Sequence, residues 1–161
     1  MAKADEALRK ELVKQLRGGN AHAKFEDATA KLSPELRGKK VKGLPYSVWQ
    51  LLEHLRIAQR DMLDFCRNHD GRYKEMKWPH DYWPKSAEPP SDKAWGASLK
   101  KFLSDREEFI ALIEDTSSDL YTPFKWGDGQ TLLHEAMLIV DHNGYHLGEI
   151  VALRRLLGSW K

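Results

Sequence analysis

The segment SVWQLLEHLRIAQRDMLDFC, residues 47–66, decides the fold. Its apolar residues recur at intervals of three and four, which is the spacing of one face of an α-helix. Ser47 followed by Gln50 forms a capping-box pattern, in which each side chain bonds the backbone of the other residue at the start of a helix. We therefore predict a helix of about five turns that ends between Asn68 and Gly71 and turns this apolar face to a core. The face consists of Val48, Leu51, Leu52, Leu55, Ala58, Met62, Phe65 and Cys66.

The N-terminal segment also has a helical pattern. It is rich in Ala, Glu, Lys and Arg and repeats leucine every four residues, so we predict a first helix that ends at Gly18 and Gly19. A shorter helical pattern restarts with Asn20 as its cap and runs to Leu32. Residues 33–45 contain basic, glycine and proline residues and are predicted to form a surface connection. The repeating leucines are Leu8, Leu12 and Leu16.

Two more long helices follow. The third begins after Ser91, whose side chain caps it, and stops near Asp115. The last runs from about Gln130 to Leu157. No strand pattern competes with these helices. Four long amphipathic helices without internal repeats predict an all-α fold, a four-helix bundle with long irregular connections.

The two long connections are rich in aromatic residues. Loops as long as residues 72–90 are usually functional or disordered, and the aromatic content of this one argues against disorder. Residues 116–129 form a second irregular stretch. Trp78, Trp83 and Trp126 either close an apolar pocket over a ligand site or serve as core filler that pins the connections onto the bundle.

Composition limits the possible partners. The 161 residues fit one domain, predicted to span 1–161, and 26 basic against 24 acidic residues leave no global field that draws a protein to nucleic acid or to an anionic membrane. We therefore expect no nucleic acid, no membrane, and a small-molecule ligand or a protein partner. One cysteine, Cys66, excludes an internal disulfide and suits a reducing compartment. The charged N-terminus lacks the apolar core of a signal peptide, so we predict a cytoplasmic protein.

Helical phase separates the histidines that can act together from those that cannot. His142 and His146 are four residues apart, so their imidazoles lie one turn apart on one face and can reach a single metal ion. His134 projects from the opposite side of that helix and is assigned to solvent. His54 lies at the margin of the apolar face of residues 47–66, where two bundle helices can meet. Spacing alone leaves open that each is a hydrogen-bonded boundary residue of the core.

The remaining titratable candidates give weaker signals. His69 and His80 lie in or beside the aromatic connection and are most simply solvated. His22 follows the break in the first helix, where it either faces the same cavity or is solvated. Cys66 lies on the apolar face and is predicted to be a buried small hydrophobe.

Two segments carry a family resemblance. SVWQLLEHL, residues 47–55, together with DHNGYHLGEIVALRRLLG, residues 141–158, resembles the DinB-like (DinB/YfiT) superfamily of bacterial four-helix-bundle proteins. The pattern of that family is one histidine on the second helix and an HxxxH on the fourth, and His54, His142 and His146 fill it. The resemblance therefore implies a single DinB-like domain that binds a divalent metal ion, zinc or nickel, through these three histidines, and that forms a homodimer.

The resemblance also suggests a class of reaction. Relatives include mycothiol-dependent maleylpyruvate isomerase and bacillithiol S-transferase, which implies a metal-dependent transferase or hydrolase acting on a low-molecular-weight thiol or a thiol-linked substrate. The alternative is a non-catalytic bundle that binds a metal or small ligand for sensing, storage or assembly. Glu53, Asp141 and Glu149 are near enough in sequence to orient a ligand imidazole. We prefer Glu149 as this residue or as a general base.

Overall fold

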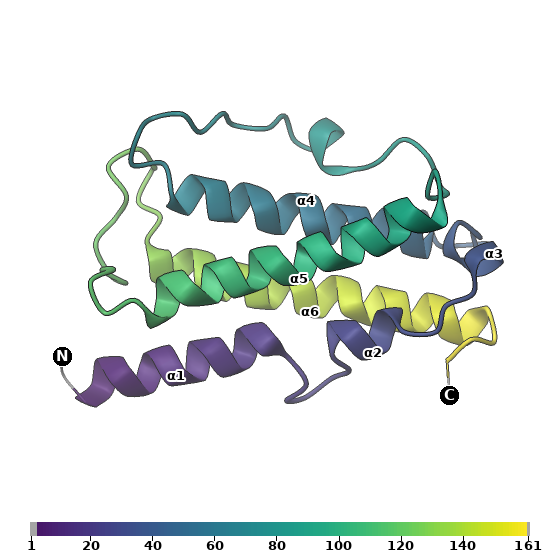
Figure 1. The fold of residues 1–161 in the computed structure, drawn as a ribbon, viewed down its shortest axis with the longest axis horizontal. Helices are drawn as coiled ribbons and strands as arrows, with labels where there is room; N and C mark the ends of the chain where they lie inside the picture. Colours follow the sequence, from purple (N-terminus) through teal and green to yellow (C-terminus); the bar gives the residue numbers. More distant parts are fainter. Residues whose placement is uncertain (1–2, 161) are drawn as a thin grey trace.

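The structure, a computed structural model, describes residues 3–160, so the ends of the predicted domain, residues 1, 2 and 161, lie outside its described part. The described chain forms six α-helices and one 3-10 turn (Figure 1). They are α1 (Lys3–Arg17), α2 (Phe25–Thr29), α3 (Pro34–Arg37), α4 (Val48–Cys66), η1 (His80–Tyr82), α5 (Asp92–Glu114) and α6 (Leu132–Leu156).

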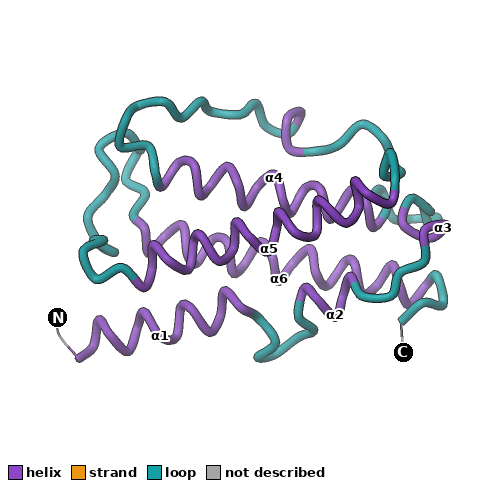
Figure 2. The backbone as a smooth tube through the Cα atoms, viewed as in Figure 1, coloured by secondary structure: helices purple, strands orange, loops and turns teal. Residues whose placement is uncertain are grey.

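The helices form a four-helix bundle in which α1 and α2 together occupy the position of one helix. Figure 1 shows α4, α5 and α6 running side by side, while α1 and α2 lie end to end along the fourth edge. Helix α4 packs against both α5 and α6, α1 packs against the same two helices, and α2 packs against α6. Between residues 3 and 160 there is no strand, as Figure 2 also shows. The predicted all-α four-helix bundle is confirmed, with its first helix broken in two.

Helix α4 begins where the capping pattern predicts. The Ser47 hydroxyl accepts a hydrogen bond from the Gln50 backbone N–H at 3.2 Å, and the Gln50 side chain accepts one from the Ser47 N–H at 3.2 Å. The helix ends at Cys66, earlier than the predicted stop between Asn68 and Gly71. The Asn68 side chain instead accepts a hydrogen bond from the Tyr73 N–H at 2.8 Å, and such bonds favour a turn over another helical residue.

The N-terminal region differs from the prediction. The first helix does end before Gly18 and Gly19, which both have positive φ. Asn20, however, caps no following helix, because its side-chain amide donates back to the Lys14 carbonyl at the end of α1. Helix α2 starts only at Phe25 and stops at Thr29, short of Leu32. Part of the predicted surface connection, at Pro34–Arg37, forms the short helix α3.

Helices α5 and α6 begin at side-chain caps. The Ser91 hydroxyl accepts from the Ala94 N–H at 3.1 Å, as predicted. The Thr131 hydroxyl accepts from the His134 N–H at 3.0 Å, so α6 begins two residues later than the predicted Gln130. The last helix ends at Leu156. Within residues 3–160, no helix combines the length and the apolar run needed to cross a bilayer.

The core consists of two apolar clusters, one at each end of the bundle. The first is centred on Phe102 and joins α2 to the first half of α4, the first half of α5 and the last turns of α6. The second is centred on Phe109 and joins α1 to the opposite halves of the same helices. The largest fully buried side chains of the two clusters are Phe102, Phe109, Leu51, Leu52, Leu55, Leu63, Ile110, Ile113, Leu120, Ile139, Ile150 and Leu153.

A layer of buried polar side chains, Gln59, Asn143 and Arg106, separates the two clusters. The Gln59 amide donates to the Phe102 carbonyl at 2.8 Å and accepts from the Asn143 amide at 3.2 Å. Arg106 donates to Glu26 of α2 at 2.7 Å. Buried polar groups are usually retained where they find partners, and these bonds join four helices, although within residues 3–160 the Nε of Arg106 donates no hydrogen bond and the Oδ1 of Asn143 accepts none.

Candidate metal centre

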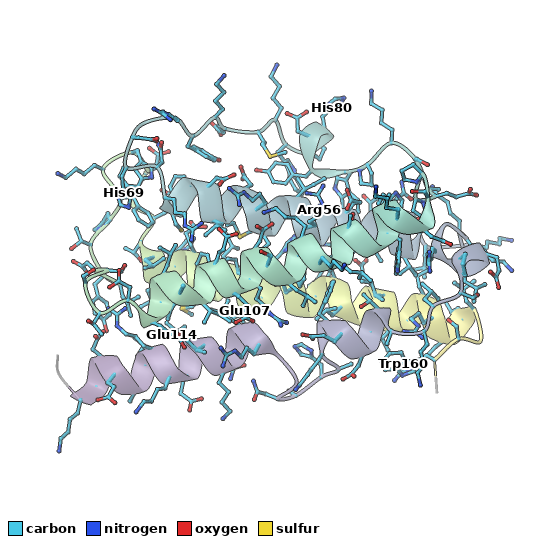
Figure 3. The ribbon with its side chains drawn as sticks, viewed as in Figure 1. Arg56, His69, His80, Glu107, Glu114 and Trp160 are labelled. Carbon is cyan, nitrogen blue, oxygen red and sulfur yellow. The ribbon has the colours of Figure 1, made fainter. Side chains whose placement is uncertain are left out.

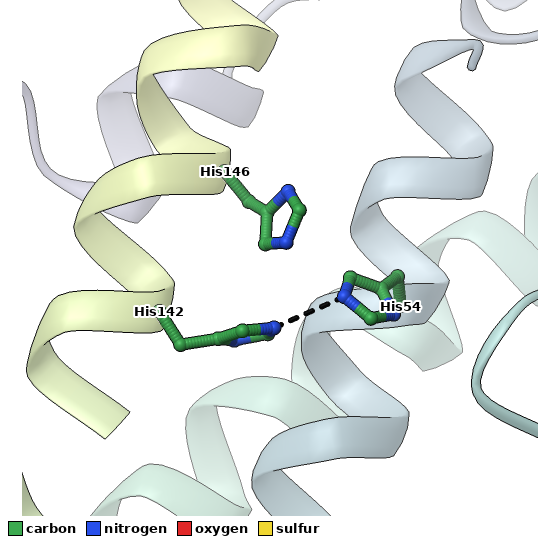
Figure 4. Close-up of side chains that lie close together, drawn as sticks. All are labelled: His54, His142 and His146. Atoms are coloured by element: carbon green, nitrogen blue, oxygen red, sulfur yellow. Dashed lines mark hydrogen bonds between the residues drawn. The ribbon is translucent and has the colours of Figure 1, made fainter. Parts of the chain in front are cut away.

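Three histidines from two helices meet beside the polar layer. His54 projects from α4, and His142 and His146 project from successive turns of α6 (Figure 4). Their ring centroids are 4.6 to 4.9 Å apart, and one nitrogen of each ring lies within 4.8 Å of the others. The fold thus brings together the three residues predicted as ligands. His134 is exposed on the same helix, as helical phase predicts.

His54 is held on two sides. Its Nδ1 donates to the Tyr82 backbone carbonyl at 3.0 Å, and its ring stacks flat on Trp83, with centroids 3.8 Å apart and planes 3° apart. Trp83 stacks in turn on Tyr46. A carbonyl only accepts hydrogen bonds, so the ring hydrogen is on Nδ1 and the lone pair of Nε2 faces the other histidines. Only 1% of His54 is exposed.

His146 is oriented by a carboxylate. Its Nδ1 donates to Glu149 at 2.6 Å, which leaves Nε2 free to bind a metal ion. Such carboxylate–imidazole pairs set the tautomer and raise the basicity of metal-binding histidines. Of the three acidic residues considered from sequence, only Glu149 forms a hydrogen bond with one of the three histidines. Glu53 bonds Arg56 at 2.8 Å, and Asp141 is exposed.

His142 completes the cluster. Its Nε2 lies 3.0 Å from the Nε2 of His54 (Figure 4), and since the latter carries no hydrogen, His142 donates. Burial, with smaller effects from the neighbouring imidazoles, lowers the pKa of His142 to about 4. Burial likewise lowers the pKa of His54 to about 4. Both rings are therefore neutral at pH 7, the form in which imidazole binds metal ions, and this donor set fits a divalent ion.

A cavity of about 730 Å³ opens beside the cluster. It follows the groove between α4 and α6 and is covered by the connection that carries η1, which Figure 2 shows arching along α4. Trp78, Trp83 and Trp126 all line it, the arrangement that the sequence suggested for a pocket. Its volume lies within the range of small-molecule sites, roughly 300–1,000 Å³.

Sequence reasoning missed two carboxyl groups in this cavity. Asp61 of α4 accepts hydrogen bonds from the hydroxyls of Tyr73 at 3.1 Å and Tyr82 at 2.6 Å. Glu135 of α6 also lines the cavity, although only 5% of it is exposed. The sequence did contain an indication of both residues. Asp61 follows His54 by seven residues and Glu135 precedes His142 by seven (61 − 54 and 142 − 135), and residues seven apart lie on the same face of a helix.

The other candidates lie away from the cluster. His22 is exposed, its Nδ1 lies 2.9 Å from the Ala23 carbonyl, and it lines a small separate cavity beside Gly144. His69 and His80 are exposed on the long connection, His80 at the start of η1 (Figure 3). Cys66 is 3% exposed, and burial raises the pKa of its thiol, which confirms a buried residue and argues against a nucleophile.

Glu149→Gln is expected to lower the affinity for a divalent metal ion by about 10- to 100-fold, the usual effect of removing a partner that orients a ligand histidine. The amide still accepts from His146 Nδ1 but brings no negative charge. Competition with a chromophoric chelator measures the affinity. Asp141→Asn, at an exposed carboxylate of the same helix, is the matched control and should bind as wild type. Equal affinities in the two variants would contradict the role of Glu149.

Comparison with protein-family models matches residues 19–150 to the DinB superfamily. This match begins after α1 and covers α2, α3, α4, η1, α5 and most of α6, and it includes all three clustered histidines. Searches of curated proteins and of solved structures found no match.

Proposed function

The chain belongs to the DinB superfamily, and from this premise we propose that it binds one divalent metal ion, zinc or nickel, through His54, His142 and His146. The observation that carries the proposal is the convergence of three imidazole nitrogens within 4.8 Å of one another. The second nitrogen of two of these rings is already bonded, to a carbonyl and to a carboxylate. Such partners are typical of metal-binding histidines.

We further propose that this site acts on a small thiol or a thiol-linked substrate, as a transferase or hydrolase. Three imidazole ligands would leave a divalent ion an open coordination position, and a bound ion would act there as a Lewis acid that lowers the pKa of a thiol or of water. The protein supplies the rest. Trp83 and Trp78 line the cavity beside His54 and give it an apolar wall, and Glu149 keeps the proton of His146 on Nδ1.

A homodimer is part of the same proposal. Helix α6 exposes Met137, Leu138 and Tyr145, with exposed fractions of 60%, 39% and 67%, and the last two also line the cavity beside the histidines. Large apolar side chains that gather on a surface are often covered by a partner. Sedimentation equilibrium of the purified protein measures the association state directly.

The experiment for the catalytic proposal is a screen of the metal-loaded protein with low-molecular-weight thiols and electrophiles. Protein purified without a metal-affinity tag is used, because such tags introduce the ions in question. Turnover that His54→Ala abolishes would support a metal-dependent enzyme. Bound metal without turnover across the screen would count against catalysis and favour a protein that binds a metal or small ligand.

A further inference from the structure

The cavity beside the histidines is acidic, although the chain as a whole is close to neutral. Five of its lining residues are carboxylic acids, and among residues 3–160 no lysine or arginine lines it. The formal net charge of the whole chain is +2. A cavity lined by one sign of charge attracts ligands of the opposite sign, so this one favours cations. The five acids are Asp61, Glu75, Asp128, Glu135 and Glu149.

Glu135 is a nearly buried carboxylic acid that reaches the cavity. It is 95% buried, yet within residues 3–160 its carboxylate accepts no hydrogen bond and forms no ion pair. A buried carboxylate without a partner is costly, and native proteins keep one where something else completes it. Burial raises the pKa of Glu135; the neighbouring His134 opposes this, and the carboxylate of Asp61 adds a smaller increase. A bound cation would supply the missing partner.

Asp61 faces the same part of the cavity in a fixed orientation. One of its oxygens accepts from the Tyr73 hydroxyl and the other from the Tyr82 hydroxyl. Each oxygen has therefore already accepted one hydrogen bond and can accept fewer from a ligand. This arrangement suits hydrogen bonds from an ammonium group, which brings three donors. It suits calcium or magnesium poorly, because these ions require six or more oxygen ligands.

The two carboxyl groups lie at a defined distance from the histidines. Both are seven residues from a clustered histidine on their own helix (61 − 54 and 142 − 135), and α4 and α6 pack side by side. Seven residues correspond to about 10 Å along a helix axis. The cavity is continuous over this length, with Met62 and Leu138 among its lining residues.

We propose that Asp61 and Glu135 form an amine-binding subsite, which takes the primary ammonium group of an elongated ligand whose other end reaches the three histidines. The ligand class is thus an amine that carries a second functional group about 10 Å away. The identity of that second group as a thiol rests on the proposed function. The ammonium contact itself does not.

Two matched pairs of thiols test the subsite in the metal-loaded protein. We expect 6-aminohexane-1-thiol to bind at least about tenfold more tightly than 6-mercaptohexan-1-ol, a difference of about 1.4 kcal/mol. The shorter pair, 4-aminobutane-1-thiol and 4-mercaptobutan-1-ol, cannot span the cavity and should show no such difference. Isothermal titration calorimetry measures all four. Equal affinities within the longer pair would overturn the proposal.

Variants locate the effect. Glu135→Gln should abolish the preference for the longer amine, while Glu114→Gln, at an exposed position on α5 (Figure 3), should retain it. A preference that survives Glu135→Gln would overturn the proposal. So would a metal content of two ions per chain that falls to one in Glu135→Gln, since the carboxyl pair would then be a second metal site.

A metal-free experiment separates this inference from the proposed function. Hexane-1,6-diamine has no thiol, and its binding to chelator-treated protein should be lost in Glu135→Gln and kept in His54→Ala. Diamine binding that depends on Glu135 in a protein that binds no metal would support the subsite and reject the metal proposal. Metal-dependent thiol binding without any preference for amines would support the metal proposal and reject the subsite.

The Glu135→Gln variant is expected to fold. Because the pKa of Glu135 is raised in the folded state, its ionised form costs stability above that pKa, and this cost disappears below the ordinary value of 4.5. The variant should therefore melt at a higher temperature than wild type at pH 7, with a difference that shrinks as the pH falls toward 4.5. Thermal denaturation followed by circular dichroism checks this.

Discussion

His54→Ala is expected to lower the affinity for a divalent metal ion by more than about 100-fold. It removes one of the three ligands, and this loss should exceed the roughly 10- to 100-fold effect of removing a residue that only orients a ligand. The change also removes the stack on Trp83 and the bond to the Tyr82 carbonyl, which hold the connection over the cavity. Elemental analysis after equilibration with a limiting metal buffer measures bound metal per chain.

His134→Ala is the matched control for this experiment. It removes a histidine of α6 that is exposed and lies outside the cluster, so its metal content should equal that of wild type. Metal content that is unchanged in His54→Ala would reject the three-histidine site. Equal losses in both variants would indicate binding at scattered surface histidines instead.

Phe102→Ala is expected to destabilise the fold by about 3–5 kcal/mol, the usual cost of removing a buried aromatic ring. Phe102 is 1% exposed and stacks on Phe25 of α2, with ring centroids 3.9 Å apart. Its loss leaves a cavity where α2 meets the rest of the bundle. Urea denaturation followed by circular dichroism gives the free energy of unfolding.

Phe102→Leu serves as the control, because it keeps an apolar side chain of intermediate volume at the same position. We expect it to cost clearly less than Phe102→Ala. Two variants of equal stability would show that the stack on Phe25 and the filled volume contribute little. A loss below about 1 kcal/mol in Phe102→Ala would have the same meaning.

The long helices could be predicted from sequence because their start signals are local. The bonds between Ser47 and Gln50 involve residues three apart, and so does the Ser91 cap of α5. The break between α1 and α2 was harder. Asn20 is a common N-cap type, but whether it caps the next helix or folds back onto the last one depends on the glycines before it. Tertiary packing of Phe25 decides where α2 begins.

The site was predictable to the extent that it lies on helices. Helical phase paired His142 with His146, and the family resemblance added His54. The hydrogen-bond partners of these histidines also differ in how well the sequence predicts them. Glu149 is one turn from His146 and was a candidate, whereas the Tyr82 carbonyl comes from an irregular connection whose path no periodicity describes. Asp61 was overlooked because acidic residues at a helix margin usually face solvent.

The hydrogen bond between Gln59 and Asn143 has a consequence for how accurately the histidines meet. Leucine contacts tolerate a slide of one helix along another, since one leucine replaces the next. A slide of α6 by one turn, about 5.4 Å, would leave the Oε1 of Gln59 and the Nδ2 of Asn143 without a partner, at a cost of about 1–3 kcal/mol each, while Gln59 would keep its bond to the Phe102 carbonyl of α5. Asn143 is adjacent to His142, so the register that this pair selects is also the register that aligns the three imidazoles.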